Sequence, residues 1–139
     1  MYSLGIYIYI LCVKVASLFN SKARLLLDGH AETFGILARA IRTNDRYVWF
    51  HASSLGEFEQ GRPLMERVRE RHPEYKILLT FFSPSGYEVR KNYNGADIVC
   101  YMPFDTCRNA RRFVRMVRPE KAFFIKYEFW KNFIDELHR

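Results

Sequence analysis

The 139-residue chain lacks the cysteine patterns that mark a metal site, a redox motif or a disulfide framework. Its cysteines, Cys12, Cys100 and Cys107, are odd in number, and no two have the spacing of metal ligands or of a C-x-x-C pair. Two of them lie in apolar segments, so we expect free, mostly buried thiols in a reducing compartment. The four histidines are also too scattered for a metal site, and the sequence predicts no bound metal.

Glycine-rich nucleotide motifs are missing as well. Neither G-x-x-x-x-G-K-[ST] nor G-x-G-x-x-G occurs, which excludes a P-loop and argues against a dinucleotide fingerprint. No Pro/Gly linker or low-complexity stretch divides the body of the chain. A mass of 16.6 kDa, with 49% hydrophobic and 17% aromatic residues, excludes disorder and suits one domain with a real core.

Acidic residues are too few to balance the basic ones. The 22 Lys and Arg against 15 Asp and Glu give a formal net charge of +7, which favours an anionic partner: nucleic acid, a phospholipid surface or a phosphorylated substrate. A basic domain with no anionic ligand remains an alternative. The stretch RRFVR (111–115) is most simply a solvated helix face, and no nucleic-acid signature accompanies it, so we expect no nucleic-acid partner.

The N-terminal segment from Tyr2 to Phe19 is apolar and carries one charge, Lys14. It has about the 17–25 residues that cross a bilayer, and no positive charge precedes it as in a secretory signal. Lys22 and Arg24 follow at once. The sequence therefore predicts a membrane-anchor helix at 1–24, spanning or lying in the interface, with the remainder on the cytoplasmic side. The alternative is an amphipathic helix packed on the same domain.

Residues 25–139 alternate between helical and strand patterns. A helical connector follows the anchor; Asp28 and Gly29 are expected to interrupt it, and Arg42–Asp45 to end it. Helical segments then separate four apolar runs. Asp105 is the expected N-cap residue of the helix that follows the third run. The four runs are RYVWFHA (46–52), YKILLTFF (75–82), ADIVCYM (96–102) and KAFFIKY (121–127). This order predicts an α/β domain with a Rossmann-like parallel sheet.

Function is expected at the carboxyl ends of these strands, where open α/β sheets bind ligands. The loops there read HASSLGE (51–57), FSPSG (82–86), MPFD (102–105) and KYEFW (126–130), whereas the opposite loops are ordinary charged turns. His51 could orient a neighbour or bind substrate, although a hydrogen-bonded core histidine is the favoured interpretation.

Glu57 falls near a helix N-terminus, where backbone N–H groups and the helix dipole keep a carboxylate ionised. It could take a proton from an incoming hydroxyl, or it could only stabilise the helix start. Beside it, Ser53, Ser54 and Gly56 could cradle a phosphate with their N–H groups. Ser83 and Ser85 offer hydroxyls next to a flexible Gly86, although a plain turn explains them equally well.

These loops, in this order, resemble the N-terminal half of the 3-deoxy-D-manno-octulosonic acid (Kdo) transferases of lipopolysaccharide synthesis. An apolar N-terminal segment precedes the loops, as in that family. The aromatic-rich sequence around the loops is similar to that of the family's Bacteroidetes branch. The matching stretches are His51–Glu57, Thr80–Gly86, Met102–Asp105, Arg118–Pro119 and Glu128–Trp130.

The resemblance implies a GT-B glycosyltransferase whose N-terminal half binds a lipid A precursor and whose C-terminal half, absent from these 139 residues, binds the donor CMP-Kdo. It implies an inverting transfer without metal or cofactor, at the cytoplasmic face of the cell inner membrane. Glu57 takes the position of the family's general base. Lys126 stands where the family often has a glutamate that helps the transition state, and Glu128 could substitute for it.

By this resemblance residues 25–139 are an incomplete acceptor-binding domain, which we expect to be inactive alone. The alternative is a non-catalytic, membrane-anchored module that binds anionic lipid.

Overall fold

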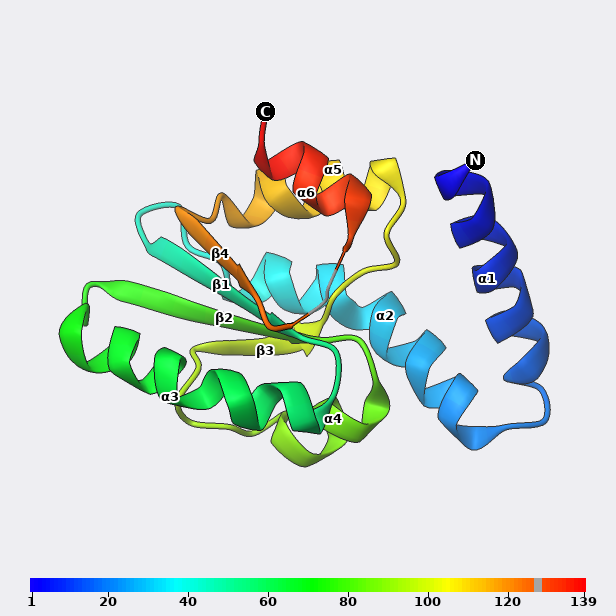
Figure 1. The fold of residues 1–139 in the computed structure, drawn as a ribbon, viewed down its shortest axis with the longest axis horizontal. Coiled ribbons are helices and arrows are strands. Elements are labelled where there is room, and N and C mark those ends of the chain that lie inside the picture. The colour runs from blue at the N-terminus through cyan, green and yellow to red at the C-terminus, as the bar shows by residue number, and fades with distance from the viewer. Residues whose placement is uncertain (127–128) are drawn as a thin grey trace.

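The computed structural model describes residues 1–126 and 129–139 and contains a four-stranded parallel sheet with the strand order β3-β2-β1-β4 (Figure 1). The strands are β1 Arg46–Ala52, β2 Tyr75–Phe81, β3 Ile98–Tyr101 and β4 Lys121–Phe124. The helices are α1 Tyr2–Ala16, α2 Ser21–Ala40, α3 Leu55–Arg71, α4 Pro84–Arg90, α5 Cys107–Val117 and α6 Lys131–Leu137. All three strand pairings are parallel, which confirms the predicted α/β class and the presence of the four predicted strands. The third and fourth strands are shorter than the predicted 96–102 and 121–127, and Tyr127 lies outside the described residues.

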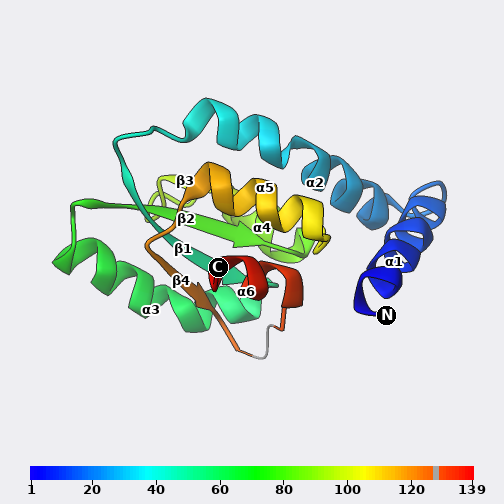
Figure 2. The same ribbon diagram turned by 90° about the horizontal axis from the view of Figure 1, so that it is seen from above.

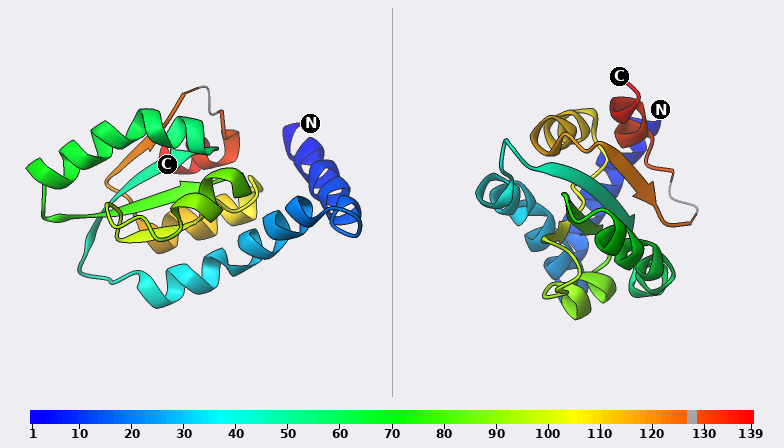
Figure 3. Two further views of the ribbon diagram at one scale, coloured as in Figure 1. Left: turned by 90° about the horizontal axis from the view of Figure 1, so that it is seen from below. Right: turned by 90° about the vertical axis from the view of Figure 1, so that its left-hand side faces the viewer.

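Helices cover both faces of the sheet, which explains why its strands are continuous apolar runs (Figures 2 and 3). Trp49 and Leu78 point to the face covered by α2, α5 and α6, where they join one buried cluster. Phe50 and Ile77 point to the opposite face, where α3 and α4 cover a second cluster. Each fully buried side chain of this size contributes roughly 1.5–3 kcal/mol, so the two clusters hold the fold together.

The connector helix α2 runs unbroken through Asp28 and Gly29, so the predicted interruption is wrong. A Cβ on Gly29 would overlap the ring of Tyr101 at the end of β3. The glycine is therefore present because helix and sheet approach closely there, and it does not break the helix. The predicted end of this helix, before Arg42–Asp45, is confirmed.

The apolar N-terminal segment forms α1, which lies beyond the carboxyl edge of the sheet beside the first turns of α2 (Figures 1 and 2). Val13 packs against Leu26 and Tyr101, and the Tyr9 ring lies 6.2 Å from the Phe82 ring. The opposite side of α1 is exposed and apolar, and includes Leu4, Tyr7, Ile8, Leu11 and Val15.

The first helix thus packs on the domain, as expected for the alternative to a membrane anchor. Its outer face is exposed and apolar. In the described part of the chain, no helix combines the length and the apolar character that crossing a membrane requires. The predicted boundary between anchor and domain, after Arg24, falls inside α2.

The three cysteines are free, as expected, but only Cys100 is buried. Cys12 and Cys107 are exposed, so the prediction of mostly buried thiols is wrong for these two. An apolar sequence around Cys12 does not bury it, because only one side of α1 contacts the domain.

Candidate functional site

The loops that follow the four strands meet at one edge of the sheet, as the parallel topology requires. Backbone hydrogen bonds extend the ladder beyond the strands: Ser83 N–H donates to Ser53 O at 2.8 Å. On either side, Met102 N–H donates to Phe81 O at 2.8 Å and Ile125 N–H to His51 O at 2.9 Å. The first two loops, which carry most of the predicted site residues, are therefore in direct contact.

Glu57 lies in the first turn of α3, three residues after the N-cap residue Ser54. The backbone N–H of Ser54 donates to Glu57 Oε2 at 2.9 Å, and the Ser54 hydroxyl donates to the same oxygen. This is a capping box, in which the side chain satisfies an N–H group that the helix leaves open. The predicted role of Glu57 at the helix start is thus confirmed, and its role as a base stays a prediction.

The electrostatic surroundings favour the charged form of Glu57. Its pKa is lowered, first by the Ser54 hydroxyl bond and then by backbone N–H groups and the positive charge of Lys126, although partial burial works in the opposite direction. The carboxylate is therefore ionised near neutral pH, half-buried, and placed beside the second loop. Such a group can accept a proton or bind a hydroxyl.

Lys126 follows β4 and is exposed, with a φ of 62° in the left-handed region. A non-glycine residue held there costs about 1–2 kcal/mol, which the surrounding contacts must offset. The positive charge of Lys126 contributes to the lowered pKa of Glu57, after the Ser54 and backbone hydrogen bonds. The two positions predicted to be catalytic thus lie at the same edge of the sheet, after β4 and at the start of α3. The predicted Glu128 lies outside the described residues.

The second loop is ordered by its own hydroxyls. Ser83 is the N-cap residue of α4; its Oγ accepts from Ser85 N–H at 3.2 Å and lies 2.9 Å from Ser85 Oγ. Gly86 is buried, and a Cβ there would overlap the Phe81 ring and lie 3.1 Å from the backbone nitrogen of Leu55. The glycine therefore allows α4 to approach the start of α3. Binding by this loop stays a prediction, as it does for Ser53, Ser54 and the exposed Gly56.

His51 is fully buried on β1, and its Nδ1 lies 2.9 Å from the hydroxyl of Thr80 on β2. The same hydroxyl accepts from Trp49 Nε1–H at 2.8 Å. Burial lowers the pKa of His51 to about 3, so the ring is neutral. The interpretation of His51 as a hydrogen-bonded core histidine is confirmed.

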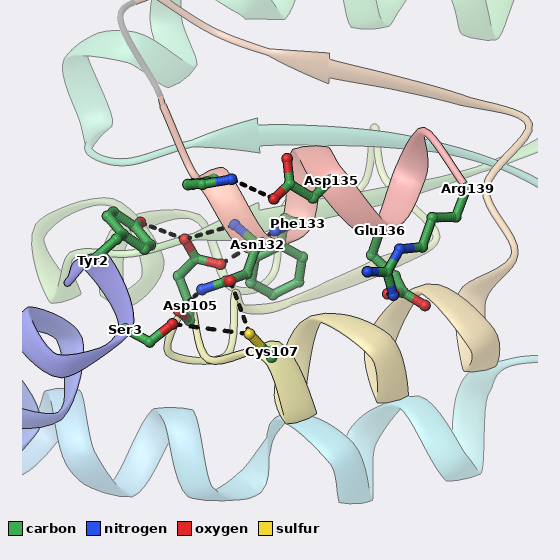
Figure 4. Close-up of polar contacts among 10 residues, drawn as sticks. Tyr2, Ser3, Asp105, Cys107, Asn132, Phe133, Asp135, Glu136 and Arg139 are labelled. Atoms are coloured by element: carbon green, nitrogen blue, oxygen red, sulfur yellow. Dashed lines mark hydrogen bonds and ion pairs between the residues drawn. The ribbon is translucent and has the colours of Figure 1, made fainter.

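Asp105 does not cap α5, as the sequence predicted. The N-cap is Thr106, whose Oγ1 accepts from Asn109 N–H at 3.2 Å. The Asp105 carboxylate is buried and accepts from the backbone N–H groups of Asn132 at 3.3 Å and Phe133 at 3.2 Å (Figure 4). The carboxylate therefore satisfies open N–H groups at the start of α6 and does not cap α5.

The Tyr2 hydroxyl also donates to Asp105 (Figure 4). Burial raises the pKa of the phenol, and this bond raises it further. One carboxylate therefore ties together α1, the loop after β3 and the start of α6, and fixes the position of α1 at the edge where the site is expected.

Sequence reasoning missed His30, which lies on α2 and faces this edge. It is 5% exposed, its Nε2 donates to Phe82 O at 3.4 Å, and its ring stacks on Phe104 with 4.2 Å between centroids. A signal was available: the buried residues of α2 are spaced by four, three and four positions, and His30 is one of them. They are Leu26, His30, Thr33 and Leu37.

No group of three or more His, Cys, Asp or Glu side chains that could hold a metal ion exists among residues 1–126 and 129–139.

Comparison with known sequences identifies related proteins. The profile of the family described as 3-deoxy-D-manno-octulosonic-acid transferase (kdotransferase) matches residues 28–139. A 3-deoxy-D-manno-octulosonic acid transferase of Haemophilus influenzae is 29% identical over 108 residues, which cover 77% of this chain and 25% of that protein. Proteins of the same name match from Aquifex aeolicus (31% over 88 residues; 63% of this chain, 24% of that protein) and Chlamydia pneumoniae (27% over 140 residues; 95% and 32%).

The chain thus spans about a quarter to a third of the length of these curated relatives. The profile match begins inside α2 and includes all four strands and the loops at their carboxyl ends. On this match, the chain belongs to the 3-deoxy-D-manno-octulosonic acid transferase family.

Proposed function

We propose that this chain is the acceptor-binding part of a GT-B glycosyltransferase that transfers Kdo from CMP-Kdo to a lipid A precursor. The observation that carries the proposal is Glu57, an ionised carboxylate fixed at the carboxyl edge of the sheet, within the matched residues. Donor binding is assigned to a part of the transferase beyond these residues.

In the proposed reaction, Glu57 takes the proton of the acceptor hydroxyl while the hydroxyl oxygen attacks the anomeric carbon of Kdo. The new C–O bond forms as the bond to CMP breaks, and CMP leaves with the electron pair of that bond. A single displacement of this kind inverts the anomeric centre and needs one base, with neither a metal ion nor a covalent intermediate. The two Ser54 bonds hold Oε2, so Oε1 is the oxygen assigned to the proton.

Lys126 is assigned to the same centre. Its positive charge adds to the hydrogen bonds that keep Glu57 ionised before reaction, and could offset negative charge on the departing CMP. The hydroxyls of Ser83 and Ser85, and the backbone of the first loop from Ser53 to Gly56, are assigned to the acceptor sugar and its phosphate. Glu128, outside the described residues, keeps its predicted place at this site.

We also propose that α1 lies in the interface of the inner membrane, at its cytoplasmic face. The exposed apolar side of α1 and the net charge of +7 both support this orientation. An acylated acceptor in the same leaflet would then reach the carboxyl edge without leaving the membrane surface.

The test is Glu57→Gln in a complete transferase that contains this chain. Glutamine at this helix position still accepts from Ser54 N–H, so the capping box survives while the base is lost. We expect transfer to fall roughly 10²–10⁴-fold, with acceptor affinity and thermal unfolding unchanged. Glu66→Gln, an exposed change on the same helix, is the matched control and should transfer normally.

Near-normal turnover of Glu57→Gln would remove Glu57 from the chemistry. Retained binding of the lipid A precursor, with no transfer by either protein, would instead favour the non-catalytic lipid-binding module. The membrane assignment has its own test: Ile8→Asn with Leu11→Asn should weaken binding to anionic vesicles. Leu64→Asn, exposed on α3, should leave that binding unchanged, and equal loss in both variants would contradict the assignment.

A further inference from the structure

The first helix, α1, packs loosely on the rest of the domain. Among its 15 residues, all of which the structure describes, only Val13 is buried. Two cavities of about 300 and 350 Å³ lie between α1 and the domain, and α1 forms part of the wall of each. Protein interiors leave few voids larger than a water molecule, so an interface with two such cavities lacks many of the contacts that would hold it. The helix therefore lies on the domain without belonging to its core.

In this position α1 covers the carboxyl edge of the sheet. The cavity of about 300 Å³ has Ile6 and Tyr9 of α1 on one side and Phe82, Phe104 and Trp130 on the other. These three aromatic residues follow β2, β3 and β4, so they belong to the loops at the edge where the site is expected. Displacement of α1 would therefore open this cavity at the candidate site.

Two polar contacts hold the first turn of α1 on the domain. The Tyr2 hydroxyl donates to Asp105, and Ser3 Oγ lies 3.9 Å from Cys107 Sγ (Figure 4). The Tyr2 bond is the stronger of the two, because its acceptor is a carboxylate. We call this bond the latch, since it fixes the end of α1 that lies farthest along the chain from α2.

The other end of α1 is joined to α2 by residues 17–20, in which Leu18 and Phe19 are exposed. Helix α2 has an N-cap of its own, because the Asn20 side chain accepts from Lys22 N–H at 2.8 Å. The start of α2 is thus maintained when α1 moves. Residues 17–20 can then absorb the change of direction as a hinge.

A bilayer would favour the displaced position of α1. The outer side of α1 is apolar and exposed, so a membrane can contact that side while α1 stays on the domain. The inner side is apolar as well, with Ile6, Tyr9, Ile10 and Val13 facing the domain. Lipid can bury this second side only after α1 has left the domain. Because the displaced helix buries more apolar surface in lipid, a membrane shifts the equilibrium towards displacement.

We propose that α1 is a lid on the carboxyl edge, closed in water as in this structure and opened by contact with a membrane. Opening breaks the latch between Tyr2 and Asp105, turns α1 about residues 17–20 and moves its inner side into lipid. The cavity beneath α1 then becomes accessible from the membrane surface. This device goes beyond the proposed transfer reaction, and it rests on the proposed contact of α1 with the membrane.

Cross-linking tests the lid in the 139-residue chain. Ser3→Cys places a thiol next to Cys107, and Cys12→Ser removes the other exposed thiol. A mild oxidant should join the two thiols within one chain in water, and anionic vesicles should slow this reaction about 10-fold or more, because α1 is then displaced. Failure to cross-link in water would contradict the closed position and overturn the proposal.

The vesicles must act on α1 and not merely shield Cys107. In the chain with Cys12→Ser alone, vesicles should leave the reaction of Cys107 with a small thiol reagent unchanged. Equal slowing of both reactions would mean that lipid covers Cys107, and would overturn the lid. Vesicle binding with undiminished cross-linking would also overturn the lid while leaving the membrane assignment standing, whereas no vesicle binding at all would overturn both.

The latch has a separate test. Tyr2→Phe removes its hydrogen bond, so the lipid concentration that halves the rate of cross-linking should fall about 2- to 10-fold. Tyr7→Phe removes a hydroxyl from the exposed outer side of the same helix and is the matched control, which should leave that concentration unchanged. The same shift in both variants, or in neither, would contradict the latch.

The locked helix also tests whether opening is needed for activity. In a complete transferase with Ser3→Cys and Cys12→Ser, oxidation should slow transfer about 10-fold or more, and reduction should restore it. The control with Cys107→Ser in addition should not respond to the oxidant. Full turnover by the locked protein would overturn the gating role of α1. Because the cross-linking in the 139-residue chain needs neither donor nor Glu57, a transferase without Kdo activity would refute the proposed function and leave the lid result standing.

Discussion

The two ends of the sheet differ in the partners that hold their charged side chains. At the amino end, Arg46 Nε lies 2.7 Å from Glu120 Oε1, and Tyr75 OH donates to Glu120 Oε2 at 2.8 Å. At the carboxyl end, Glu57 is held mainly by an uncharged serine, and His30 keeps an open acceptor. Arg46 and Glu120 at the amino end form a direct ion pair, whereas Glu57 at the carboxyl end is held by uncharged hydrogen-bond donors. The difference indicates that the carboxyl end is built for a ligand, and it can be tested by perturbing the ends one at a time.

Acid should produce the largest effect, and it should act on the carboxyl end. The pKa values of His30 and His51 are lowered from 6.5 to about 4 and about 3 by burial. Between pH 6.5 and 4 the unfolded chain binds more protons than the folded one, so stability rises with pH and is lost as pH falls. Each histidine contributes a slope of about 1.4 kcal/mol per pH unit in this window. Urea unfolding measured at several pH values gives the slope directly.

His30→Phe should remove about half of that slope. Glu120→Gln, at the other end, should leave it unchanged, because the pKa of Glu120 is lowered from 4.5 to about 2 by Arg46 and then Tyr75. Stability from this carboxylate is lost only as pH falls below about 4.5. Stability that is flat from pH 6.5 to 4.5 would contradict the neutral, buried state of both histidines.

Asp105 should give the next largest effect. Asp105→Ala leaves the N–H groups of Asn132 and Phe133 and the Tyr2 hydroxyl without their acceptor, so we expect a loss of about 2–4 kcal/mol in the free energy of unfolding. The matched change is Tyr2→Phe, which removes only one of the three bonds and should cost about 1 kcal/mol. Denaturant midpoints at neutral pH check both, and equal losses would mean that the bonds to α6 contribute little.

How far the sequence predicts this molecule depends on the range of the interactions. Buried strands such as Arg46–Ala52 were predicted residue by residue, because a run buried on both faces is a local pattern. Asp105 was assigned to the wrong helix, because a carboxylate next to two helix starts does not reveal from sequence which one it serves. Gly29 was interpreted as a break, because its partner Tyr101 lies far along the chain.

The contacts of the candidate site also differ in range: some are local in the sequence, and others depend on the fold. Glu57 and Ser54 are three residues apart, so a capping box between them is visible in the sequence. The placement of Lys126 at the same edge as Glu57 depends on strand order, which brings β4 next to β1. His30 enters the edge from α2 through contacts with Phe82 and Phe104, and no local pattern shows that two loops close over it.

Gly29→Ala should lower the free energy of unfolding by less than Asp105→Ala does, through a contact at the carboxyl end of the sheet. The added Cβ would overlap the Tyr101 ring, and overpacking of this kind costs about 1–3 kcal/mol. Gly35→Ala is the matched control on the same helix, where the nearest atom is a mobile guanidinium nitrogen of Arg39 at 3.5 Å. Since alanine favours helices, it should stabilise the chain by up to about 1 kcal/mol. Opposite signs in thermal unfolding are expected, and equal effects would contradict the close approach of α2 to β3.

The smallest effect should come from the amino end itself. Arg46 and Glu120 are 52% and 39% exposed in their side chains, so water and salt screen their attraction. Glu120→Gln should therefore change the neutral-pH unfolding free energy less than any substitution above, and the change should shrink between about 0.05 M and about 0.5 M salt. A large, salt-independent loss would show that the ion pair is a structural requirement. The electrostatic contrast between the two ends would then no longer support a ligand site at the carboxyl end, because both ends would depend on fixed polar partners.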